Sequence, residues 1–266
     1  MGLRIIFTLL IVSCFLPSCG QSFPFSTDSS AFNLPEKSVS MLKHRYGEPA
    51  LHFLSLHDNE DTGVKAAFEF MRVNGGSLVE LRYGSVRNIV FCSDSAELQI
   101  DPNRMFSTFG IEAFFEDEKS ARQISSLADT LLRLYDYEKT GYILTLHNNT
   151  DSAFSIQSYL AGNDLEGVAS EVYINPEMDP DDFVLVTEPF FFEYLKKRKV
   201  STVLQSPTTP DDGSLSLYAG LRKIPYINVE VQHRHLDENL RLINEVHGML
   251  QEYRKTAAAR QAVSNN

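Results

Sequence analysis

Short apolar runs alternate with amphipathic stretches along most of this chain. Each short run is rich in leucine, β-branched and aromatic residues, which is typical of a buried strand. Between the runs, apolar residues recur three or four positions apart, which is typical of helices packed on a sheet. The expected strands cover residues 51–56, 78–82, 88–91, 97–100, 142–146, 183–187, 202–204 and 226–231. The expected helices cover residues 62–72, 116–137 and 189–196, with a last helix beginning near Leu236.

The alternation of strands and helices predicts an α/β fold. We expect a mixed, mostly parallel central sheet with helices on both faces. The Gly84-Ser85 pair lies between the runs 78–82 and 88–91, which predicts a hairpin and therefore an antiparallel edge. Roughly 250 residues remain after an N-terminal leader, which is enough for one such domain with a sizeable core.

The N-terminus has the pattern of an export signal. Arg4 precedes an apolar run over residues 5–15, which is too short to span a membrane comfortably. The sequence LPSCG that follows resembles a bacterial lipobox, in which the cysteine receives a lipid. Cys14 ends a second possible lipobox, but Cys19 follows a longer apolar run and precedes a Ser-rich tract. We therefore expect a lipoprotein signal peptide over residues 1–18 and lipidation at Cys19, which would anchor the protein to a membrane of the cell envelope, in the periplasm or facing outward.

Composition divides the rest of the chain into three parts. Residues 19–36, rich in Ser and Phe with two prolines, predict a tether between membrane and domain. Residues 37–255 predict the globular domain, and the Ala-rich residues 256–266 predict a frayed tail.

The net charge of −11 argues against a nucleic-acid partner, because such partners select basic surfaces.

Polar side chains with metal-binding chemistry follow three of the expected strands. His57 and Glu60 come directly after the first apolar run, and His147 ends a later one. An imidazole and a carboxylate three residues apart can bind one metal ion when the backbone turns between them. Glu230 lies in a third apolar run, where an unpaired carboxylate would be costly. Because open α/β sheets place their sites at the carboxyl ends of strands, we expect these side chains to meet.

Four short motifs occur in a fixed order along the chain. They are HDNE at 57–60, DPNRMF at 101–106, LHNNT at 146–150 and NVEV at 228–231. Together they resemble the HGNE, DLNRxF and DLHNTT motifs and the late catalytic strand of the zinc carboxypeptidases, in particular the succinylglutamate desuccinylase and aspartoacylase branch. The resemblance spans roughly residues 50–250, and the ordered set is more specific than any single motif.

The resemblance implies a zinc hydrolase and assigns a role to six side chains. Zinc would be the cofactor, with one coordination position left for water. A guanidinium and a neighbouring amide suit a substrate carboxylate, because they offer several donors in a fixed arrangement. The implied zinc ligands are His57, Glu60 and His147, the implied general base is Glu230, and the implied carboxylate-binding residues are Asn103 and Arg104.

The chain also departs from the family pattern. Asp58 replaces the Gly of HGNE, Pro102 replaces the Leu of DLNR, and Thr145 replaces the Asp of DLHNTT. The family has a further Arg a few residues before its Asn-Arg pair. Here Arg87 and Arg82 lie well upstream, so the sequence leaves the cation that would polarise the attacked carbonyl unassigned.

These observations predict a zinc-dependent hydrolase of an amide bond in a carboxylate-bearing peptide or N-acyl amino acid. An address at the cell envelope favours a peptide, including a stem peptide of peptidoglycan. Two alternatives remain open, an N-acyl amino acid deacylase and a non-catalytic binding lipoprotein that keeps the fold. The presence of all four residues of the expected metal and base set counts against the second alternative, because a decayed site usually loses one of them.

Overall fold

A computed structural model describes residues 24–93, 96–151 and 154–264 of the chain. The strands are β1 (Phe25–Leu34), β2 (Lys37–Tyr46), β3 (Leu51–Ser55), β4 (Gly76–Arg82), β5 (Ile89–Ser93), β6 (Ala96–Ile100), β7 (Ile143–Asn149), β8 (Ala169–Tyr173), β9 (Phe183–Val186), β10 (Thr202–Gln205) and β11 (Tyr226–Gln232). The helices are α1 (Asp61–Asn74), α2 (Thr108–Glu112), α3 (Glu118–Tyr135), α4 (Tyr137–Thr140), α5 (Pro189–Lys197), α6 (Leu215–Leu221) and α7 (Leu236–Ser264), with short 3-10 turns η1 (Pro102–Arg104) and η2 (Ile156–Tyr159).

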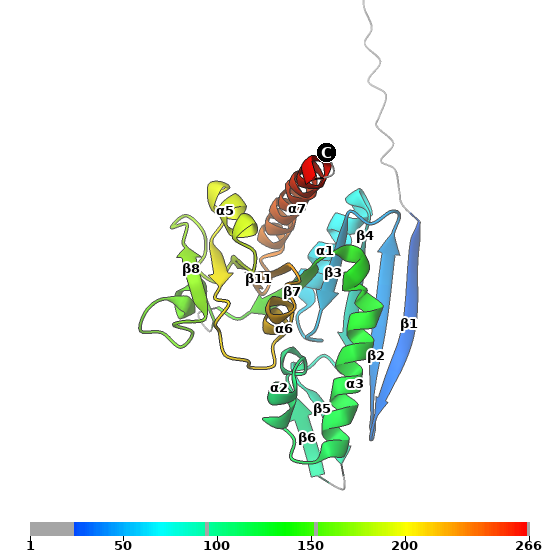
Figure 1. Cartoon of the computed structure of the whole chain (residues 1–266). Coiled ribbons are helices and arrows are strands. Elements are labelled where there is room, and N and C mark those ends of the chain that lie inside the picture. The colour runs from blue at the N-terminus through cyan, green and yellow to red at the C-terminus, as the bar shows by residue number, and fades with distance from the viewer. Residues whose placement is uncertain (1–23, 94–95, 152–153, 265–266) are drawn as a thin grey trace, which may run out of the picture.

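One sheet organises the fold (Figure 1). Its nine strands have the order β1-β2-β4-β3-β7-β11-β9-β10-β8, while β5 and β6 form a separate two-stranded sheet. The central strands β4, β3, β7 and β11 pair in parallel, and antiparallel pairs flank them on both sides. The predicted α/β fold with a mixed, mostly parallel central sheet is therefore confirmed.

Helices cover both faces of the sheet, and each face has its own apolar core. On one face, α1, α5 and α7 bury side chains such as Phe70, Phe191 and Ile243. On the other face, α3 and α6 bury Ile124 and Leu215 together with the β5–β6 hairpin. Because both faces are covered, the central strands are buried on both sides, which explains why they occur as continuous apolar runs in the sequence.

The predicted tether is wrong for the part of it that the structure describes. Residues 25–34 form β1, which pairs with β2 from Phe25↔Tyr46 to Leu34↔Lys37. Most side chains of β1 are exposed, so the strand lacks the apolar periodicity that marks strands in a sequence. Backbone pairing along one edge of the sheet forms this strand without an apolar face. Within the described residues, the domain therefore includes β1 in addition to the predicted range 37–255.

The predicted hairpin around Gly84-Ser85 is also wrong. β4 lies between β2 and β3 in the large sheet, and β5 pairs with β6 instead. Gly84 has a φ of 118° and Ser85 a φ of 57°, so the backbone turns away from β4 at these residues. The sheet does have antiparallel edges, but β1 paired with β2 and β8 paired with β10 form them.

The chain ends in a longer helix than the sequence predicts. α7 continues to Ser264 and so includes most of the residues 256–266, for which the sequence predicts a frayed tail. Alanine is the best helix former, and it stabilises this last part. The predicted signal peptide and Cys19 lie outside the described residues. Within the described ranges, no helix is both long and apolar enough to span a membrane.

Candidate metal centre

His57, Glu60 and His147 meet at the carboxyl ends of two neighbouring central strands. His57 and Glu60 lie in the short connection from β3 to α1, where Glu60 N donates to His57 O at 3.2 Å. This turn brings the two side chains together. His147 comes from β7, which lies next to β3 in the sheet. One potential ligand atom from each residue lies within 4.8 Å of the other two, and all three residues are buried. The expected convergence of these residues is therefore present.

The geometry of this metal cluster (His57, Glu60 and His147) is tight. His57 Nδ1 lies 2.9 Å from Glu60 Oε1, and His147 Nδ1 lies 3.0 Å from Glu60 Oε2. The two Nδ1 atoms are 3.1 Å apart. Two imidazoles thus turn the same nitrogen toward one carboxylate. This donor set, two imidazole nitrogens and one carboxylate, is one that divalent transition metals bind, and it fits a metal ion.

A second carboxylate orients one of the histidines. Asp101 Oδ1 lies 2.8 Å from His57 Nε2, on the far side of the ring from the cluster. A carboxylate in this position fixes the ring and makes the inward nitrogen a better ligand. His147 Nε2 is buried and has no hydrogen-bond partner among the described residues. The two rings are therefore held differently, although both direct Nδ1 inward.

Mutual pairing keeps the cluster charged although it is buried. Burial by itself would raise the pKa of Glu60, but the two histidines hold that pKa far below its usual range. Burial would likewise lower the pKa of His57, but Glu60 and Asp101 outweigh it and raise the pKa to about 9. The carboxylates thus stabilise positive charge at this point. A metal cation would supply that charge in place of the protons.

Glu230 lies beside the cluster on the next strand. It is paired in register with His147 across the parallel strands β11 and β7, and paired residues direct their side chains to the same face. Glu230 is buried, and the amide of Asn228 donates to its Oε2 at 3.2 Å. Burial raises the pKa of Glu230 to about 7, although the nearby His147 opposes the shift. The carboxyl group can therefore gain or lose a proton near neutral pH.

Arg87 places a guanidinium beside the cluster. Its guanidinium donates to Glu60 Oε1 at 3.0 Å and to Asp101 Oδ2 at 3.1 Å. The β5–β6 hairpin lies between Arg87 and Asp101 in the sequence. Because Ile89 pairs with Ile100, the hairpin brings Arg87 and Asp101 close together. The apolar runs at 88–91 and 97–100 were the only sequence signal for this arrangement, and pairing them with each other would have placed Arg87 here.

Asn103 and Arg104 follow Asp101 in η1. Asp101 Oδ1 accepts from Asn103 N at 2.8 Å, which starts this short turn. Asn103 Oδ1 accepts from Leu215 N at 3.1 Å and so caps the first turn of α6. Arg104 pairs with Asp212 at 3.5 Å, and its side chain is 37% exposed. Both residues thus follow Asp101, which bonds to His57, but among the described residues neither bonds to the side chains of the cluster itself.

Gly110 and Gly213 allow the backbone around Arg104 to approach the loop before α6 closely. Phe106 N donates to Gly213 O at 3.0 Å. A Cβ atom on Gly213 would lie only 2.4 Å from the carbonyl oxygen of Arg104, and one on Gly110 only 2.3 Å from Gly213 Cα. Gly213 also has a φ of 81°, which other residues rarely adopt. The backbone that presents Arg104 is therefore fixed by direct contact with the backbone of residues 211–214.

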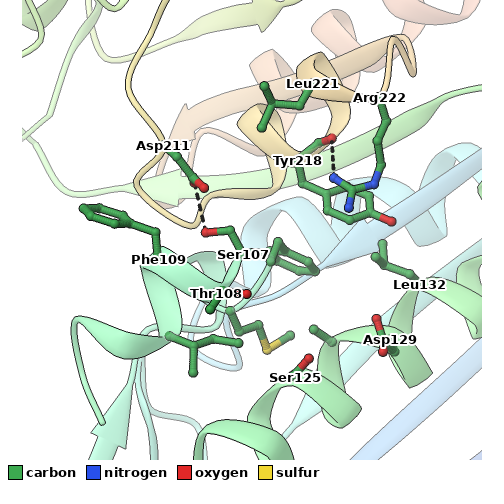
Figure 2. A pocket seen from close by; sticks show the side chains of 14 residues that line it. Ser107, Thr108, Phe109, Ser125, Asp129, Leu132, Asp211, Tyr218, Leu221 and Arg222 are labelled. Carbon is green, nitrogen blue, oxygen red and sulfur yellow. Dashed lines mark hydrogen bonds between the residues drawn. The ribbon is translucent and has the colours of Figure 1, made fainter. Parts of the chain in front are cut away.

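A cavity of about 410 Å³ lies between α2, α3 and α6 (Figure 2). Apolar side chains such as Met105 and Leu132 line it together with Tyr218, whose ring stacks under the Arg222 guanidinium at 3.8 Å. At its edge, Ser107 donates to Asp211, as Figure 2 shows. None of the residues of the metal cluster lines this cavity. It is therefore a separate feature and not the entrance to the candidate metal centre.

Comparison with known proteins gives no match in sequence and only weak likenesses in structure. No protein-family model matches the chain, and no curated protein matches it in sequence. Among solved structures, it is similar to an aspartoacylase family protein from Mesorhizobium loti, with a TM-score of 0.43, 14% identity and coverage of 83% of this chain. It is also similar to a metallo-carboxypeptidase from Burkholderia cenocepacia, with a TM-score of 0.43, 10% identity and coverage of 85%.

The four motifs, and not these weak likenesses in structure, carry the family resemblance of this chain. The chain spans 65% of the length of each of these two proteins. Likeness at such low identity concerns the fold alone. The function of this chain must therefore be inferred from its own side chains.

Proposed function

We propose that this protein is a zinc-dependent hydrolase that cleaves an amide bond in a carboxylate-bearing peptide or N-acyl amino acid. The observation that carries the proposal is the buried convergence of His57, Glu60 and His147, with Glu230 beside them. Three protein ligands and one open position are the pattern of a catalytic zinc site. When bound, zinc would supply positive charge that polarises a carbonyl and makes water nucleophilic at neutral pH.

Glu230 has the position and chemistry of the general base. Its carboxylate would accept the proton of the attacking water and then pass it to the leaving nitrogen. A pKa of about 7 suits both steps, because the group must accept and release a proton at the same pH. Arg87 would stabilise the negative charge that develops on the carbonyl oxygen. Its guanidinium bonds to Glu60 and Asp101, and its side chain is still 54% exposed.

Arg104 and Asn103 are the proposed site for the substrate carboxylate. The ion pair of Arg104 with Asp212 is long, and both side chains are partly exposed, so the pair is weak. A substrate carboxylate could replace Asp212 and accept two parallel hydrogen bonds from the guanidinium. The capping bond from Leu215 to Asn103 Oδ1 holds that side chain beside the start of α6.

We expect Arg104→Ala to weaken hydrolysis selectively. The variant should lose about 10-fold or more in kcat/KM on a substrate with a free carboxylate, because a charge-assisted pair is lost. It should matter much less for the same substrate with that group amidated, because no charge is present to pair. Kinetics on the matched acid and amide measure the difference. An equal loss on both substrates would show that Arg104 does not bind the carboxylate.

We also propose an address at the cell envelope, which the N-terminal pattern supports. Cys19→Ala should release the protein from membranes or block its processing, because a short apolar segment anchors poorly once it is cleaved. Metabolic labelling with a fatty-acid analogue should mark the wild type and not the variant. Cys14→Ala is the matched control and should still be labelled. Equal labelling of the wild type and Cys19→Ala would exclude lipidation at Cys19.

One screen tests the proposed reaction. The purified, zinc-loaded chain is incubated with peptidoglycan fragments and with N-acyl amino acids, and the products are identified by mass spectrometry. Cleavage of a stem peptide supports the envelope peptidase, and cleavage only of N-acyl amino acids identifies the alternative deacylase. If zinc-loaded protein binds such compounds and cleaves none, the chain is a non-catalytic binding protein and the proposed hydrolase is wrong.

A further inference from the structure

Asp58 lies between the candidate metal ligands His57 and Glu60 in the sequence, and its carboxylate binds the start of the loop 83–87. Its side chain is only 3% exposed. Asp58 Oδ2 accepts hydrogen bonds from three successive backbone N–H groups, with lengths of 2.5, 2.6 and 2.7 Å. These N–H groups belong to Tyr83, Gly84 and Ser85. Arg82 donates to the other oxygen, Oδ1, at 3.0 Å. One buried carboxylate thus accepts the hydrogen bonds of the first three backbone N–H groups of the loop 83–87.

The conformation of this loop depends on such an acceptor. The positive φ angles at Gly84 and Ser85 turn successive N–H groups toward one point, where they form a concave site for an anion. A φ of 57° is uncommon for serine, so the turn needs compensating contacts. The buried N–H group of Tyr83 would add a further cost if it had no acceptor. The Asp58 carboxylate supplies the acceptor and the negative charge together.

A second contact fastens the far end of the loop. The Tyr83 hydroxyl lies 2.8 Å from the carbonyl oxygen of Arg87 and 3.2 Å from that of Leu56. It also accepts from Asp58 N at 3.2 Å. The backbone of Arg87 is therefore bound to the segment that leads into the metal ligands. From this position the Arg87 side chain reaches Glu60 and Asp101.

We propose that Asp58 is a positioning residue that holds Arg87 in the candidate active site. It acts through the loop 83–87, and it touches neither the substrate nor the reacting atoms. The motif HGNE has glycine at this position, and glycine has no side chain that could make these bonds. The contact between Asp58 and the loop is therefore a feature in which this chain differs from that motif. The consequence for catalysis rests on the proposed function. The consequence for the position of Arg87 does not.

The position of Arg87 is tested without any substrate. Two rates are measured by mass spectrometry on the full-length, zinc-loaded chain: amide hydrogen exchange over residues 82–88, and modification of Arg87 by phenylglyoxal. In Asp58→Ala, both should increase by about 10-fold or more, because the loop loses its acceptor. Modification of Arg222, in the separate cavity, gives an internal reference that should not change.

Two further variants make the test specific. Asp61→Ala removes a carboxylate that also lies near Arg82, at 3.4 Å, but bonds to none of the loop N–H groups, so it should behave like the wild type. Asp58→Asn keeps one oxygen acceptor without the charge and should be intermediate. If Asp58→Ala does not fold, the comparison of Asp58→Asn with the wild type decides. Wild-type exchange and wild-type Arg87 reactivity in the folded Asp58 variants would overturn the proposal.

A double-mutant cycle tests the consequence for catalysis. On a substrate found in the screen, Asp58→Ala should lower kcat about 10- to 100-fold, the scale typical of residues that orient a metal site. In an Arg87→Ala background the same change should cost nothing further, because Asp58 acts only through Arg87. A full additional loss in that background would overturn the proposal. If the wild type cleaves nothing, the proposed function fails, while exchange and reactivity still decide the role of Asp58.

Discussion

Replacing either His57 or His147 with alanine is expected to remove most of the bound zinc. The wild type should carry about one zinc per chain, and each variant less than about a tenth of that, because two protein ligands seldom retain the metal. Both Nδ1 atoms lie within 3.1 Å of a Glu60 oxygen, so each histidine supplies one third of the donor set. Elemental analysis after dialysis measures the loss.

The matched control is a histidine outside the cluster. His247→Ala, in α7, removes an imidazole that bonds to Gln251, and it should leave the zinc content unchanged. Full zinc stoichiometry in both His57→Ala and His147→Ala would rule out this metal site. It would also remove the basis of the proposed hydrolase.

Glu230→Gln is expected to separate catalysis from binding. The amide keeps the shape and hydrogen-bonding ability of the carboxylate but cannot accept a proton. Zinc content and substrate affinity should stay close to those of the wild type, while kcat falls by about 10²-fold or more, the scale of general-base loss. Burial raises the pKa of Glu230 although His147 opposes the shift, and Glu230 is the residue of β11 that pairs in register with His147 on β7.

Glu188→Gln is the matched control for that variant. Burial also raises the pKa of Glu188. This residue comes just before α5 and follows the carboxyl end of β9, which lies beside Tyr226. Glu230 pairs with the opposite end of β9, at Phe183. We expect Glu188→Gln to keep wild-type turnover. If Glu230→Gln is as active as the wild type, the base has been assigned to the wrong residue.

The metal cluster could be predicted from the sequence because strand ends are easy to recognise. His57, His147 and Glu230 each end or follow an apolar run. Parallel strands have all their carboxyl ends at the same end of the sheet, so these residues come together there. Neighbouring strands then place His147 and Glu230 in register. The apolar runs in the sequence and the parallel pairing of the strands therefore predict the same positions for these side chains.

Arg87 could not be placed because its position depends on pairing between strands. Interpreting Gly84-Ser85 as a hairpin turn paired the wrong strands and left Arg87 outside the site. The turn has another cause, the three N–H groups that bond to Asp58, and this contact between distant segments leaves no local pattern. β1 was missed for a different reason, since a strand exposed on both faces has the composition of a linker.

The contact between Gly110 and Gly213 limits which residues could change around Arg104, the proposed site for a substrate carboxylate. Any larger residue at either position would push apart the two backbones that meet behind Arg104. Asp212, next to Gly213, is about half exposed and points its carboxylate toward Arg104 instead. Natural variation or directed evolution can therefore change the charge facing Arg104 at residue 212 without disturbing the main chain. The charge that faces the proposed carboxylate site can therefore vary at residue 212, whereas the neighbouring residue 213 is restricted to glycine.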